Sequence, residues 1–138
     1  MITIDMRLLR YINLLEKISG IKTKRCFIYN NQVIFAVPRK LLSKAIGPKG
    51  ANIEMLSKKI NKKVKIISEL NGTNDIERFI GEIVSPTRFK SIEITETELI
   101  ISAGNFQNKA SLIGRDRKKE ADLKKIVREN LNLELKII

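Results

Sequence analysis

Four residues between two helix-forming segments have the types and spacing that could bind a phosphate backbone, namely Gly47, Pro48, Lys49 and Gly50. Glycine at both ends of the loop lets a polymer backbone approach without meeting a side chain. The first amides of the helix that follows can donate to phosphate oxygens, and Lys49 adds a full positive charge. The alternative interpretation is a type I turn that only joins two helices, with Pro48 second and Gly50 fourth.

Basic residues near this loop favour the phosphate interpretation. Residues 1–70 contain 15 Lys and Arg against 4 Asp and Glu, whereas residues 71–138 contain 12 against 11. A basic cluster beside a helix start is the electrostatic footprint of a site for a polyanion, and a solvated basic face is the alternative. The candidate contacts outside the loop are Arg39, Lys40, Lys44 and Lys58, with Lys59, Lys62 and Lys63 in the same basic region.

A variant of the loop occurs in the second half of the chain, in the segment Gly114, Arg115, Asp116, Arg117 and Lys118. It lacks the closing glycine, and the carboxylate of Asp116 disfavours a nearby phosphate. Three cations, Arg115, Arg117 and Lys118, keep the local charge positive. Either this loop contacts a polyanion through its arginines, or the second half of the chain is mainly a structural partner of the first half.

The composition argues against most catalytic chemistry. The chain has no histidine and a single cysteine, Cys26, so a histidine general base, a His-containing or Cys-only zinc site and an intramolecular disulfide are all excluded. We therefore expect no enzyme, no catalytic residue, no metal and no cofactor. No apolar run approaches the ~18 residues of a membrane span, and no signal peptide is evident, so we expect a cytoplasmic protein that does not contact membranes.

Hydrophobic periodicity in the first half predicts a mixed set of helices and strands. The two strands are rich in β-branched and aromatic residues, and Asn30-Asn31 between them predicts a tight hairpin. The expected elements are a helix over Asp5–Ile18, strands over Arg25–Tyr29 and Gln32–Val37, helices over Arg39–Ile46 and Ala51–Ile60, and a strand over Val64–Ile67.

The second half repeats this order at an offset of 67 residues, which carries Ile34 to Ile101 and Gly47 to Gly114. The closing strand matches at an offset of 71, so the last helix should be about one turn longer. The expected elements are a helix over Asp75–Val84, strands over Phe89–Thr95 and Leu99–Ala103, helices over Asn105–Ile113 and Lys118–Asn130, and a strand over Leu135–Ile138. This repeat predicts two domains, residues 1–70 and 71–138, joined by a short turn-type segment.

A helix, a GxxG loop and a second helix placed after a hairpin resemble a KH RNA-binding domain. The extra helix and strand in front are similar to the prokaryotic, type II form of that domain. The run Ala45–Ala51 resembles the first KH loop of the NusA family of transcription factors, and Phe79–Pro86 resembles the lead into its second KH domain. The resemblance covers almost the whole chain and is strongest to the small archaeal NusA-like proteins. It implies an α+β, two-layer fold of two tandem type II KH domains.

The resemblance also implies a function. Each KH unit would bind about four nucleotides of single-stranded RNA. The RNA would be nascent transcript, the further partners would be RNA polymerase or other transcription factors, and the outcome would be modulation of elongation, termination or antitermination. The alternative within the same binding chemistry is a KH factor in ribosome assembly or translation. A nucleic-acid-processing enzyme is the third hypothesis, and the absence of histidine and of a metal cluster disfavours it.

Overall fold

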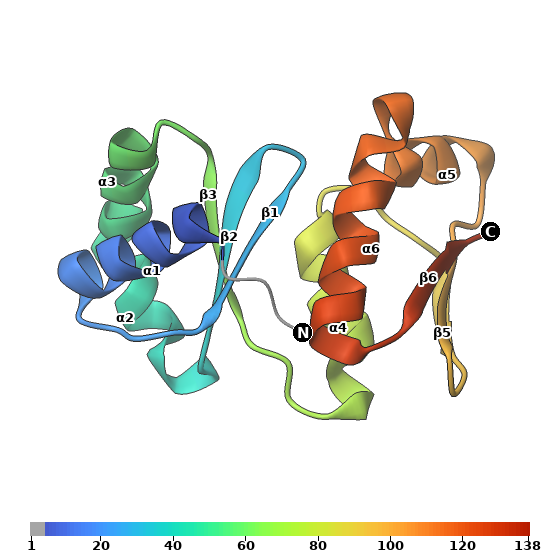
Figure 1. Cartoon of the computed structure of the whole chain (residues 1–138), viewed down its shortest axis with the longest axis horizontal. Helices are drawn as coiled ribbons and strands as arrows, with labels where there is room; N and C mark the ends of the chain where they lie inside the picture. Colours follow the sequence, from blue (N-terminus) through green and yellow to red (C-terminus); the bar gives the residue numbers. More distant parts are fainter. Residues whose placement is uncertain (1–4) are drawn as a thin grey trace. The chain divides into compact units, whose positions relative to one another are not determined.

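The computed structural model describes residues 5–138, and the chain folds into two compact units, Met1–Gly72 and Thr73–Ile138. The division lies between residues 72 and 73, two residues beyond the boundary expected from the sequence repeat. Each unit has the order helix, strand, strand, helix, helix, strand. Figure 1 shows the three labelled helices of the first unit, α1, α2 and α3, on one side of their sheet.

The first unit combines a helical layer with a three-stranded sheet. Its elements are α1 (Met6–Ser19), β1 (Arg25–Tyr29), β2 (Gln32–Val37), α2 (Leu42–Ile46), α3 (Ala51–Ile60) and β3 (Val64–Ser68). β2 is the central strand, antiparallel to β1 and parallel to β3. The parallel pair requires a crossover, which α2 and α3 supply, and this crossover carries the glycine loop.

Local sequence signals set the limits of these elements. The carboxylate of Asp5 accepts a hydrogen bond from the Arg7 amide at 2.8 Å and caps α1. Gly20 ends the same helix in the left-handed conformation, with φ of 76°. Asn30 and Asn31 both have positive φ, 50° and 60°, as a type I′ hairpin turn requires. The expected hairpin is therefore confirmed.

The core of the first unit lies between the helices and one face of the sheet. It is formed by apolar side chains that are at most 8% exposed, which are Tyr11, Leu15, Ile21, Cys26, Val33, Phe35, Val37, Ala45, Leu56, Val64 and Ile66. The contributions of β2 come from alternate residues, because successive side chains of a strand point to opposite faces. This packing fixes α2 and α3, and with them the loop that joins the two helices.

The second unit repeats the architecture of the first. Its elements are α4 (Ile76–Val84), β4 (Ser91–Ile94), β5 (Glu98–Ser102), α5 (Phe106–Ile113), α6 (Lys118–Leu131) and β6 (Glu134–Ile137). β5 is the central strand, antiparallel to β4 and parallel to β6. α6 has 14 residues and α3 has 10, as the two repeat offsets require. The expected α+β fold of two tandem type II KH-like units is confirmed.

Two expected elements differ from those in the structure by more than one residue at an end. The helix expected over Arg39–Ile46 begins as a 3-10 turn, Arg39–Leu41, and becomes α-helical only from Leu42. The strand expected over Phe89–Thr95 is shorter and spans Ser91–Ile94. The chain turns at Thr95, whose amide donates to the Glu98 carbonyl at 2.9 Å and whose hydroxyl accepts hydrogen bonds from the amides of Thr97 and Glu98.

Candidate nucleic-acid interface

The loop Gly47–Gly50 is a tight turn with an unusual backbone. The Gly50 amide donates to the Gly47 carbonyl at 3.1 Å, which closes the turn. Lys49, the third residue, has φ of 54° and ψ of 30°. A type I turn requires a negative φ at this position, whereas a type II turn requires a positive one. The type I interpretation is therefore wrong, and the backbone of Lys49 has a left-handed conformation.

Gly47 is required by the fold. Its φ of 81° and ψ of 166° lie in a region that only glycine adopts readily. A Cβ at this position would also lie 2.9 Å from Cγ of Asn52. Asn52 occupies that space because its Nδ2 donates to the Lys44 carbonyl at 3.1 Å, which ties the start of α3 to the end of α2. Asn52 was not predicted from the sequence, where the only signal is an amide side chain in the first turn of a helix.

Gly50 differs from Gly47 because the fold does not require a glycine there. Its φ of 74° and ψ of 20° lie in the left-handed helical region, and a Cβ would have nothing within 4 Å. Arg117 occupies the equivalent position of the second loop with φ of 59° and ψ of 23°. A residue with a side chain is thus tolerated in this backbone conformation, and glycine at position 50 leaves the outer surface of the first loop bare.

The first turn of α3 adds donors to this surface. The cap residue, Gly50, has no side chain to accept from the first amides of the helix. Such amides carry partial positive charge and are a binding site for anions. Four cationic side chains lie in the loop or in the segment that leads into it, and all four are exposed and without an ion pair among residues 5–138, namely Arg39, Lys40, Lys44 and Lys49.

Three other lysines of the basic region expected near the loop lie farther from it. Lys58 is eight residues after Gly50, about 12 Å along the axis of α3, and its Nζ lies 3.8 Å from an Oε1 of Glu54. Lys62 donates to Oδ1 of Asn31 at 2.7 Å, at the hairpin turn. Lys59 lines a pocket between α1 and α3. These three lysines are therefore distributed along α3, at the hairpin turn and at the pocket, and are not gathered at the loop.

The second loop has nearly the same backbone as the first. Gly114 has φ of 75° and ψ of 173°, and Asp116 has φ of 56° and ψ of 26°. The Arg117 amide donates to the Gly114 carbonyl at 3.2 Å, which matches the bond that closes the first turn. A Cβ on Gly114 would lie 2.8 Å from Cγ of Lys119. The first glycine is thus retained in both loops because the turn requires it.

The side chain of Arg117 is bound to the first turn of α6. Its Nε donates to Oε1 of Glu120 at 2.8 Å and its Nη2 donates to Oε2 at 3.3 Å. Glu120 is only 8% exposed, and the hydrogen bond from Arg117 holds the pKa of its carboxyl below the usual range. Arg115 and Lys118, by contrast, are exposed and have no ion pair within the described part of the chain. They are the available cations of the second loop.

The remaining chemistry-bearing groups take no part in this surface. Cys26 is buried in β1, and burial raises the pKa of its thiol to about 12. Among residues 5–138, no group of three or more His, Cys, Asp or Glu side chains could hold a metal ion. Over the same residues, no helix is both long and apolar enough to cross a membrane. One exposed aromatic was not predicted from the sequence: Phe106, the first residue of α5, is 83% exposed.

Comparison with curated proteins shows a sequence similarity to a protein from an archaeon. The chain is 25% identical over 117 residues to a protein of Halococcus morrhuae described as a probable transcription termination protein NusA. The match covers 83% of this chain and 82% of the relative. No protein-family model matches the chain.

A solved structure supports the fold over nearly the full length. The crystal structure of APE1850 superposes with a TM-score of 0.69 at 23% sequence identity. The superposition covers 98% of this chain and 100% of that one. The two chains therefore share their fold.

Proposed function

We propose that the protein binds single-stranded RNA through the loop Gly47–Gly50 and the start of α3. The observation that carries this proposal is the bare surface at Gly50, where the backbone permits a side chain and none is present. A phosphate can approach the start of α3 there, and Lys44 and Lys49 supply charge that positions the backbone without specifying sequence. RNA bases would lie against aliphatic surface of the flanking helices, as in KH modules.

The second loop makes a weaker contact in this proposal. Its backbone follows the same path, but Asp116 opposes a phosphate and Arg117 carries a side chain where Gly50 has none. Arg115 and Lys118 provide the remaining attraction. Because residues 71–138 are nearly neutral in sum, most of the electrostatic affinity comes from the first unit.

The direct test of RNA binding is fluorescence anisotropy with short labelled single-stranded RNA, comparing the wild type with Gly50→Asp. Aspartate tolerates the left-handed backbone, so this variant should fold and place a carboxylate on the binding surface. We expect its affinity to fall at least about tenfold, which corresponds to about 1.4 kcal/mol.

Gly72→Asp is the matched control, since Gly72 also has positive φ and open space around it and lies outside the loop. If Gly50→Asp and Gly72→Asp bind RNA with equal affinity, and circular dichroism shows that both are folded, the loop is not the binding site. RNA then binds a diffuse basic face. Loss of affinity in Arg115→Ala as well would identify the second loop as a contact.

We further propose that the RNA is a nascent transcript and that the protein modulates transcription elongation or termination. The support is the similarity to the Halococcus protein described as a probable transcription termination protein. Affinity purification of the tagged full chain should recover RNA polymerase. Recovery of ribosomal particles instead would favour a role in ribosome assembly or translation.

A further inference from the structure

The first unit contains a pocket that the RNA-binding proposal does not use. It lies between α1 and the C-terminal end of α3 and has a volume of about 430 Å³. Lys59 and Ile60, which line it, follow Gly50 by nine and ten residues, so the pocket is about 13 Å from the loop along the axis of α3. This volume is in the range of pockets that hold small ligands or peptide side chains.

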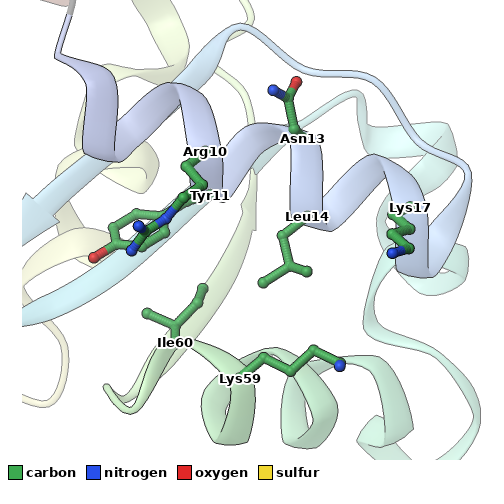
Figure 2. Close-up of a pocket in the computed structure, with 7 residues that line it drawn as sticks. All are labelled: Arg10, Tyr11, Asn13, Leu14, Lys17, Lys59 and Ile60. Carbon is green, nitrogen blue, oxygen red and sulfur yellow. The ribbon is translucent and has the colours of Figure 1, made fainter.

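The pocket has an apolar floor. Figure 2 shows the side chain of Leu14 pointing from α1 toward α3, with Ile60 of α3 below it. Both side chains are only partly buried, whereas Tyr11, which also lines the pocket, is 5% exposed. The ring of Tyr11 therefore has little free surface on which a nucleobase could stack, and the floor suits an aliphatic side chain better than a base.

The rim of the pocket is cationic. Arg10 and Lys17 come from α1, and Lys59 comes from α3. These three side chains are exposed, and none has an ion pair within the described part of the chain. Other cations of the unit do have acidic partners, as in Arg7 with Asp5. Three unpaired cations around an apolar floor create a local positive potential that an acidic ligand would neutralise.

The surface continues along α1 beyond the pocket. Met6 is 71% exposed and Leu9 is 41% exposed. Met6, Arg10 and Lys17 are separated by four and seven residues, so they lie on one stripe of the helix. A partner that follows this stripe could place one apolar side chain over Leu14 and Ile60 and another against Met6 and Leu9.

We propose that this groove, comprising the pocket and the exposed stripe of α1, docks an acidic segment of a protein partner that carries aliphatic anchor residues. Aliphatic side chains of the segment would fill the pocket, and its carboxylates would pair with Arg10, Lys17 and Lys59. An amphipathic helix lying in a groove between two helices is a common form of such recognition. This proposal does not depend on RNA binding by the glycine loop.

The test uses the full chain and a fluorescein-labelled peptide of about 14 residues, or four helical turns, made of Glu, Ala and Leu with leucines at helical spacing. We expect binding with a Kd below about 1 mM, and amide chemical-shift changes that are largest at Leu14, Lys17 and Ile60. A peptide of the same composition in scrambled order, which has the same charge, should bind at least about fivefold more weakly.

Two variants with equal charge change separate the groove from the overall charge. Lys59→Glu should weaken peptide binding at least about fivefold, and Lys24→Glu, at an exposed lysine outside the groove, should change it less than about twofold. Leu14→Ala should also weaken binding, because it removes part of the apolar floor.

Four results would overturn the proposal: no binding below about 1 mM, equal binding of the scrambled peptide, equal effects of the two lysine variants, or displacement of the peptide by single-stranded RNA. The last result would assign the groove to RNA. None of these results would bear on Gly50→Asp, whose readout is RNA affinity.

Discussion

At the scale of single residues, the two glycines of the first loop have different roles. Gly47 has a backbone conformation outside the range of other residues, and Asn52 occupies the space that its Cβ would need. Gly50 has a conformation that Arg117 adopts at the equivalent position of the second unit. The fold therefore requires the glycine at position 47, whereas it permits a side chain at position 50, where we propose that RNA binds.

This difference predicts unequal effects of alanine at the two positions. Gly50→Ala should lower the free energy of unfolding by about 1 kcal/mol, the cost of a left-handed backbone. Gly47→Ala should cost more than about 2 kcal/mol, because backbone strain is joined by displacement of Asn52. Urea denaturation of both variants measures the difference, and equal losses would contradict the assignment.

The ion pair of Arg117 with Glu120 predicts a pH-dependent stability. Because the pKa of Glu120 is lower in the folded protein than in the unfolded chain, the carboxylate stabilises the fold above the unfolded value of about 4.3. This contribution is lost as the pH falls through the folded pKa. Glu120→Gln should therefore lower the Tm at pH 7, and the difference from the wild type should shrink below about pH 4.

Glu129→Gln is the control for this measurement, since Glu129 is an exposed carboxylate on the same helix. It removes the same charge and should leave the Tm nearly unchanged at both pH values. If the Tm difference between the wild type and Glu120→Gln does not depend on pH, Glu120 acts by packing alone.

At the scale of secondary-structure elements, α5 depends on its cap. Oδ1 of Asn105 accepts a hydrogen bond from the Asn108 amide at 2.7 Å, as expected from an Asn at the helix start. α5 has only eight residues and leads directly into the second loop. A short helix depends strongly on its cap and on tertiary packing.

Asn105→Ala should therefore destabilise the protein by about 1 kcal/mol, measured by chemical denaturation. Gln107→Ala changes an exposed residue in the same turn without removing the cap, and it should have little effect on the free energy of unfolding. If the two variants lose similar amounts of the free energy of unfolding, the hydrogen bond of the Asn105 cap makes no specific contribution to stability.

At the scale of the whole molecule, the uneven charge determines how RNA affinity should respond to salt. If about four to six phosphates are neutralised, the slope of log affinity against log salt should be about −3 to −4. Lys49→Ala should reduce the magnitude of this slope by about 0.7, the contribution of one phosphate contact. Lys24→Ala, at an exposed lysine that is not part of the loop or of α3, should leave the slope unchanged. A slope near zero would exclude binding through phosphates.

Much of the fold was predictable from local signals. Three local signals determine a turn, a cap and a strand through interactions within a few residues, namely Asn30-Asn31, Asn105 and the run of β-branched and aromatic residues in Gln32–Val37. The internal repeat then placed the same elements in the second half, and it located both loops. These features depend on near neighbours in the chain, so one sequence is enough to reveal them.

The amino-acid sequence by itself determined where the two loops lie, which of them lacks its closing glycine and how unevenly the charge is distributed. Only the tertiary structure showed that Asn52 makes Gly47 necessary, that Glu120 holds Arg117 and that Lys59 lines a pocket with α1. The physical reason is that a side chain's partners depend on its direction and on packing between elements. Residue type and spacing along the chain do not specify either of these.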